Sequence, residues 1–199
     1  MGFAYPVMLD LTGTDVLVVG GGAVARRKIA GLVDAGALVT VVAPLVGDDV
    51  VALAARVERR PFAAGDIAGR TMVLTCTDDP AVNAAVAAAC RAANVWVNSA
   101  DDPANCTFAL PAVTRQGRIV VAVGSGGGSP ALAQHVRDRI AAEILDERIA
   151  AAADVLAAER DAIHAAGGST EGLDWAARLA ELLQQPTDES GRAGGSVGS

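Results

Sequence analysis

The sequence predicts an α/β fold in which a mostly parallel β-sheet is covered by helices on both faces. Three observations predict it: strand and helix patterns alternate through roughly the first 125 residues, the strands are continuous apolar runs, and a glycine-rich turn follows the first strand. Because apolar side chains line both faces of such strands, the sheet needs cover on both sides, which is typical of parallel sheets between helices.

The first half of the chain repeats a strand and helix rhythm that begins with a βαβ unit. The expected strands span residues 15–19, 37–43, 57–60, 71–77 and 95–98. The expected helices span residues 23–35, 48–56 and 80–93. Pro80 favours the start of the third helix, because proline is common at the first helical position.

The pattern changes after Pro111, where a second subdomain begins. Residues 112–114 and 118–123 read as a strand pair joined by a polar turn at 115–117. Ser129-Pro130 then starts a helix, and further helices are expected at 147–166 and 172–184. The Gly, Ser and charged residues of 186–199 predict a disordered tail. The expected domains span residues 1–112, 113–146, 147–185 and 186–199.

Charge and cysteine content exclude several classes of partner. The formal net charge is -7 with a pI near 4.7, whereas nucleic acids and anionic membranes need a basic surface. No apolar run reaches the roughly 18 residues that span a bilayer, and a signal peptide is not evident. Cys76, Cys90 and Cys106 are far apart, so we expect reduced thiols, no metal site and a cytoplasmic protein.

A dinucleotide-binding motif, G-x-G-x-x-A, lies where the first strand turns into a helix. Gly20 permits the tight turn, Gly22 lets the backbone approach a pyrophosphate, and Ala25 allows close packing of helix and sheet. We expect the cofactor to contact Gly20, Gly22, Ala23 and Val24. The alternative is a glycine turn of a doubly wound domain that binds no cofactor.

The second strand lacks the acidic residue that usually binds the adenosine ribose, because it ends Val41-Val42-Ala43-Pro44. We expect Ala43, Pro44 and Leu45 to hold the adenosine through backbone and apolar contacts, and the choice between NAD and NADP stays open. The adjacent cations at 26–28 either neutralise phosphate or substrate carboxylate, or form a solvated helix face.

Further polar residues follow the fourth and fifth strands, at the sheet edge where such folds bind ligands. Thr77 and Asp78 come first, and we expect them to contact the cofactor, although Asp78 and Asp79 are also ordinary helix caps. Asn98 and Asp101 follow the next strand. A half-buried carboxylate is thereby expected beside the nicotinamide.

The resemblance to a known family rests on four segments in order: Val18-Val19-Gly20-Gly21-Gly22-x-Val24-Ala25-x-Arg27-Lys28, then Thr77-Asp78-Asp79-x-x-Val82-Asn83, then Asn98-x-x-Asp101-x-Pro103 with Phe108 and Pro111, then Ser125-Gly126-Gly127-x-Ser129-Pro130. Together they cover residues 8 to about 146 and resemble the precorrin-2 dehydrogenases, which include the N-terminal module of siroheme synthases. Nothing similar to the methyltransferase module of those synthases follows, so methylation is not expected.

The resemblance implies a Rossmann-like NAD domain, a small dimerisation region, C-terminal helices and a homodimer. It implies NAD-dependent oxidation of precorrin-2, a tetrapyrrole with eight carboxylates, to sirohydrochlorin, with Asp101 as the key catalytic group. We expect Asp101 to act as general base, and Asn98, Ser125, Gly126 and Gly127 to bind substrate. Two alternatives remain: a dehydrogenase that is also a sirohydrochlorin ferrochelatase, and an NAD-sensing module without catalysis.

Overall fold

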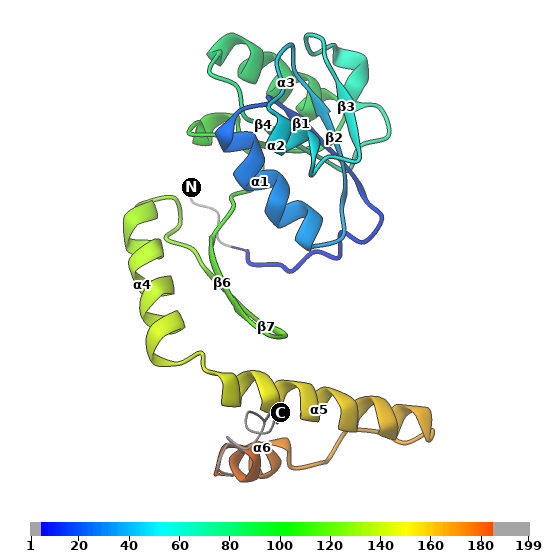
Figure 1. Cartoon of the computed structure of the whole chain (residues 1–199), viewed down its shortest axis with the longest axis vertical. Helices are drawn as coiled ribbons and strands as arrows, with labels where there is room; N and C mark the ends of the chain where they lie inside the picture. Colours follow the sequence, from blue (N-terminus) through cyan, green and yellow to red (C-terminus); the bar gives the residue numbers. More distant parts are fainter. Residues whose placement is uncertain (1–4, 185–199) are drawn as a thin grey trace, which may run out of the picture. The chain divides into compact units, whose positions relative to one another are not determined.

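The computed structural model describes residues 5–184, so the tail expected to be disordered lies outside the described residues. The chain divides into two compact units (Figure 1). The first contains the residues up to Leu110 together with Gly126–Gly128, and the second contains Pro111–Ser125 and the residues from Ser129 onward.

A five-stranded parallel sheet forms the centre of the first unit. Its strands are β1 (Asp15–Val19), β2 (Leu38–Val42), β3 (Arg56–Glu58), β4 (Met72–Thr75) and β5 (Trp96–Ser99). Their spatial order is β3-β2-β1-β4-β5, and all neighbours are parallel. The predicted Rossmann-like α/β class is confirmed. Val19 lies opposite both Val42 and Thr75, so three strands end at one edge of the sheet.

Apolar clusters cover both faces of the sheet. On one face, α1 (Ala23–Asp34) and α2 (Asp48–Val51) pack through Ile29 and Val50. On the other, α3 (Pro80–Ala92) and the 3-10 helix η1 (Ala64–Ile67) pack through Val86 and Ile67. Because every residue of β4 is buried, as its continuous apolar sequence predicts, the sheet has no solvent-facing side at its centre.

The helix expected at residues 48–56 is much shorter, because α2 ends at Val51. The backbone N–H of Ala55 already bonds to the carbonyl of Val39, at 2.9 Å. The chain therefore has to leave the helix early to enter the sheet as β3, which starts at Arg56 and not at Val57. Pairing with β2 overrides the local helical pattern here.

The second unit starts with an antiparallel hairpin of β6 (Ala112–Gln116) and β7 (Ile119–Val123). The turn expected at 115–117 is wrong, because Arg115 and Gln116 pair with Val120 and Ile119. Gly117 adopts a positive φ of 55°, which suits a tight two-residue turn.

Up to residue 184 the hairpin is followed by three helices: α4 (Pro130–Glu143), α5 (Glu147–Ala165) and α6 (Trp175–Gln184). Helix α6 begins three residues later than expected, and the carboxylate of Asp174 accepts the backbone N–H of Ala177 at its start. Between residues 5 and 184, the chain contains no helix with the length and apolar character that a bilayer crossing requires.

Candidate active site

The first two glycines of the loop after β1 are required by packing within the protein. Gly20 has a φ of 124°, and a Cβ there would collide with the carbonyl oxygen of Cys76. A Cβ on Gly21 would collide with the carbonyl oxygen of Leu45. The loop therefore lies tightly between the ends of β4 and β2.

Gly22 has no such internal reason to be glycine. A Cβ built on it would meet no protein atom within 4 Å, and its φ of -97° is open to any residue. Gly22 is also the N-cap of α1, a helix whose first N–H groups receive no side-chain cap from it. An open backbone at an uncapped helix N-terminus, followed by Ala23 and Val24, fits the close approach of a pyrophosphate.

The segment after β2 lies against the glycine loop. The backbone N–H of Gly47 bonds to the carbonyl of Gly21 at 3.1 Å. Ala43 is buried, whereas Pro44 and Leu45 are exposed, and Leu45 has 86% of its surface accessible. Pro44 and Leu45 therefore form an apolar surface at the position where dinucleotide-binding folds usually have an acidic residue.

A cleft of about 420 Å³ opens at the carboxyl edge of the sheet. It is lined by segments from three places in the chain, namely Val24, residues 76–78, 80 and 83, and residues 100–102. The structure thus brings together four residues selected from the sequence: Val24, Thr77, Asp78 and Asp101. All of its lining residues belong to the first unit.

The two adjacent carboxylates after β4 have different roles. Asp79 is the N-cap of α3, and its Oδ1 accepts the backbone N–H of Ala81 at 2.8 Å. Asp78 is exposed in the cleft. Thr77 Oγ1 donates to Asn83 Oδ1 at 2.8 Å, and Asn83 Nδ2 donates back to the Thr77 carbonyl at 3.0 Å. This reciprocal pair holds the backbone of the cleft wall.

Asp101 lies in a tight turn that closes when Asp102 N–H bonds to the Ser99 carbonyl, at 3.4 Å. Its φ is 57°, a conformation that favours glycine. Asp102 is engaged, because its Oδ2 accepts Asn105 Nδ2 at 2.6 Å. Within residues 5–184 no hydrogen bond or salt bridge engages the Asp101 carboxylate, which is exposed and not half-buried as the sequence suggested.

Comparisons with known proteins identify the relatives of this chain. The family described as "Putative NAD(P)-binding" matches residues 7–112. A siroheme synthase of Pseudomonas putida is 43% identical over 143 residues, which are 70% of this chain and 31% of that protein. A siroheme synthase of Methylococcus capsulatus is 44% identical over 139 residues, which are 68% of this chain and 29% of that protein.

A solved structure titled "SirC, precorrin-2 dehydrogenase" matches with a TM-score of 0.69 and 31% identity, over 94% of this chain and 90% of SirC. The chain belongs to the precorrin-2 dehydrogenase and siroheme synthase N-terminal domain family. The family predicted from the sequence is thus confirmed. The chain spans about 30% of the length of the siroheme synthases that it matches.

Two residues of the family motifs bond to each other across the first unit. Lys28 Nζ, on α1, donates to Asn98 Oδ1, on β5, at 2.6 Å. Asn98 is buried, and its Nδ2 donates to the Phe108 carbonyl at 3.0 Å. The Asn98 amide, expected to bind substrate, is therefore used inside the chain. The sequence reading missed this pair, because no local pattern relates residues 70 positions apart.

The glycine-rich motif at 125–129 introduces α4. Gly126 and Gly127 have φ values of 62° and 83°, so both need the freedom of glycine. Ser125 Oγ accepts the backbone N–H of Ser129 at 3.0 Å, and Ser129 Oγ accepts Leu132 N–H at 3.2 Å. The two serines hold the motif in a defined turn at the start of the helix.

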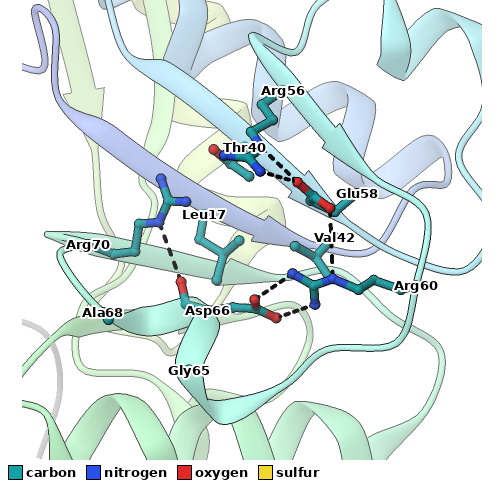
Figure 2. A pocket seen from close by; sticks show the side chains of 10 residues that line it. All are labelled: Leu17, Thr40, Val42, Arg56, Glu58, Arg60, Gly65, Asp66, Ala68 and Arg70. Atoms are coloured by element: carbon teal, nitrogen blue, oxygen red, sulfur yellow. Dashed lines mark hydrogen bonds and ion pairs between the residues drawn. The ribbon is translucent and has the colours of Figure 1, made fainter.

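A second, smaller pocket of about 170 Å³ lies against β2 and β3 (Figure 2). Its cations face carboxylates: Arg60 binds Asp66 through two hydrogen bonds of 2.9 and 2.7 Å, and Arg56 contacts Glu58. The hydrogen bond from Arg60 lowers the pKa of Asp66 below its usual value. The third arginine, Arg70, contacts Asp15 at 3.3 Å, so each arginine has a carboxylate partner and this pocket is a poor anion site.

Metal-ligating side chains do not gather anywhere in the described part of this family member. No group of three or more His, Cys, Asp or Glu residues there has the arrangement that a metal ion needs. The free thiols are Cys76, Cys90 and Cys106, and the first two are buried. Burial raises the pKa of Cys76 and of Cys90 to about 11.

Proposed function

We propose that this chain oxidises precorrin-2 to sirohydrochlorin, with NAD as cofactor and Asp101 as general base. The observation that carries the proposal is that Asp101 lines the same cleft as Val24 at the start of α1. Its backbone conformation would suit glycine better. A carboxylate kept in an unfavourable backbone conformation, inside a cleft, supports a functional role for its side chain.

The cofactor would be held by the first unit. Gly20, Gly22, Ala23 and Val24 would receive the pyrophosphate, and Gly22 leaves the space that this needs. Ala43, Pro44 and Leu45 would hold the adenosine, and Thr77 and Asp78 would contact the cofactor on the β4 side. When bound, the nicotinamide supplies a hydride acceptor.

Two arginines near the adenosine end are engaged by carboxylates, which makes them less available to a 2′-phosphate and supports NAD over NADP. A 2′-phosphate needs an available cation. Arg26, one turn into α1, is paired with Asp49 at 3.1 Å, and Arg60, after β3, is paired with Asp66. Comparing the Kd values of NAD and NADP tests this preference, and tighter binding of NADP would contradict it.

Asp101 would take the proton that leaves the substrate. The oxidation removes two hydrogens, one as a hydride and one as a proton, and extends the conjugation of the macrocycle. Because the exposed carboxylate has no protein partner in the described chain, both of its oxygens are open to a substrate C–H or N–H, directly or through one water. A positioned base of this kind accelerates a reaction by about 10²- to 10⁴-fold.

The substrate carries eight carboxylates, so the enzyme needs anion-binding groups besides Asp101. We assign Ser125, Gly126 and Gly127 to this role, because successive backbone N–H groups in a glycine-rich turn can converge on an anion. Asn98 remains a proposed substrate-binding residue, because its strand, β5, leads directly into the cleft residues 100–102.

We also propose a homodimer that acts in the cytoplasm. Several apolar side chains of the second unit are exposed, namely Val120, Leu132, Val136 and Ile144. Exposed apolar residues on a hairpin and a neighbouring helix support an interface between two copies. Analytical ultracentrifugation tests the assembly, and a monomer at micromolar concentration would contradict it.

One experiment separates the proposed activity from its alternatives. Purified protein is mixed with precorrin-2 and NAD or NADP, ferrous or cobaltous ion is added afterwards, and absorbance is followed throughout. A dehydrogenase forms sirohydrochlorin only when the cofactor is present. Accelerated metal insertion after that step would add a chelatase activity. Cofactor binding without any turnover would contradict the proposal and favour an NAD-sensing module.

A further inference from the structure

The outer edge of β5 is closed by side chains and not by another strand. β5 is the last strand of the sheet, so the N–H groups of Val97 and Ser99 point away from β4. Val97 N–H donates to Thr107 Oγ1 at 2.8 Å, and Ser99 N–H donates to Cys106 Sγ at 3.1 Å. The segment after the turn thus folds back along β5.

Cys106 makes more side-chain contacts than Thr107. Its sulfur accepts a long hydrogen bond of 3.6 Å from Asn98 Nδ2, and its other three contacts concern the turn that carries Asp101. Its Sγ lies 3.3 Å from the carbonyl oxygen of Ser99 and 3.3 Å from that of Asp102, and its S–H can donate to either. The same sulfur accepts the Ser99 N–H. One atom therefore contacts both ends of the turn, with Asp101 between them.

The turn needs such support because Asp101 has a φ of 57°. Most non-glycine residues lose roughly 1–2 kcal/mol in this region, Asp and Asn less than others, and such a conformation persists when its surroundings hold it. Without the sulfur, Ser99 and Asp102 lose a shared anchor, and the backbone of Asp101 can relax. Its carboxylate would then leave the orientation that the cleft requires.

We propose that Cys106 is a positioning residue that holds the carboxylate of Asp101 in its reactive orientation, through the two ends of the Ser99–Asp102 turn. The proposal rests on the proposed role of Asp101 as general base. Loss of orientation by about 1 Å lowers turnover by up to about 100-fold. The loss should appear in kcat and not in the Kd for NAD, because the glycine loop that would hold the cofactor is a separate segment.

Three variants test the proposal. Cys106→Ala removes the sulfur, and we expect kcat to fall by about 10- to 100-fold while the Kd for NAD changes less than about twofold. Cys106→Ser keeps a donor and an acceptor, so kcat should stay within about threefold of the parent. Thr107→Val serves as the control, because it removes the side-chain contact to the Val97 N–H. It should lower the thermal stability about as much as Cys106→Ala does and leave kcat unchanged.

A double-mutant cycle shows whether Cys106 acts through Asp101. In an Asp101→Asn background, Cys106→Ala should lower kcat by less than about twofold. If the kcat losses of Asp101→Asn and Cys106→Ala multiply in the double variant, the proposal is overturned. Equal kcat losses in Cys106→Ala and Thr107→Val would overturn it as well. Full turnover by Asp101→Asn alone would instead refute the proposed general base, so the two failures are distinguishable.

Discussion

The ammonium nitrogen of Lys28 lies 2.6 Å from Oδ1 of Asn98 and joins α1, which follows the glycine loop, to β5, which precedes the Asp101 turn. Lys28 is the only lysine of the chain, and Asn98 is 6% exposed. A charge-assisted hydrogen bond to a buried amide therefore connects two walls of the proposed active site.

Replacing Lys28 with Met should destabilise the protein by about 1.5–3 kcal/mol, because the buried Asn98 oxygen loses a charged donor. Methionine keeps the apolar stem, so packing changes little. Urea unfolding measures the effect. Arg27→Met, an exposed neighbour on the same helix, is the control and should change stability by less than about 0.5 kcal/mol; equal losses in both variants would contradict the assignment.

Substitutions at Gly22 should weaken cofactor binding without unfolding the protein. Gly22→Ala places a methyl group in the open space, and we expect the Kd for NAD to rise about 10-fold. Gly22→Asp adds a negative charge beside the pyrophosphate and should raise it by about 100-fold or more. Isothermal titration calorimetry measures both values.

The control for this series is Gly31→Asp, which adds the same charge to an open position further along α1. Its Kd for NAD should change less than about threefold, since the charge lies more than two turns from the helix N-terminus. Normal binding by Gly22→Asp would mean that the pyrophosphate lies elsewhere.

Variants of Asp101 should separate activity from stability. Asp101→Asn and Asp101→Gly should both lower kcat by about 10²- to 10⁴-fold while NAD still binds. Asp101→Gly should be at least as stable as the parent, because glycine tolerates a φ of 57°. Asp102→Asn keeps an acceptor for Asn105, and its loss of kcat should be at least tenfold smaller than that of Asp101→Asn. A loss of kcat larger than that of Asp101→Asn would assign the base to Asp102.

Alkaline pH should destabilise the protein through its buried thiols. Burial raises the pKa of Cys76 and Cys90 to about 11, above the value of 9.0 for an exposed thiol. Their contribution to stability is complete below pH 9 and is lost as pH rises toward 11, because the unfolded chain then releases protons that the folded chain retains. Each thiol should contribute about 2 kcal/mol to this loss.

Urea unfolding between pH 8 and pH 11 checks this prediction. Cys90→Ala should flatten the alkaline decline, although its stability at pH 8 is lower because a buried side chain is truncated. A decline as steep as that of the parent would show that Cys90 does not titrate in this range. Cys106→Ser provides a comparison at a thiol outside the buried core.

The parallel sheet could be predicted from the sequence because its signals are local. The strand at 15–19 and the helix starts at Ala23, Pro80 and Pro130 follow from apolar runs, glycine and proline. The end of α2 could not be predicted, because the pairing of Ala55 with Val39 depends on the assembled sheet. Local pattern contains no information about such distant contacts.

The same limit applies to the candidate site. The glycine motif identified the loop, and family resemblance selected Asp101, but neither indicated its left-handed backbone conformation. The side-chain contacts of Cys106 and the bond between Lys28 and Asn98 appear only in three dimensions. An isolated cysteine or lysine in a sequence has too many alternative roles for a specific partner to be chosen.

The closed border of β5 also limits how molecules of this protein can associate. Exposed strand borders attract strands of other molecules and promote aggregation. Because Thr107 and Cys106 occupy the outward N–H groups of β5, a foreign strand finds no free donors at Val97 or Ser99. At the opposite border, β3 has three residues and carries Arg56 and Glu58. Extension of the five-stranded sheet by another molecule is therefore disfavoured at both of its ends, which lowers the tendency of the first unit to form fibrous assemblies.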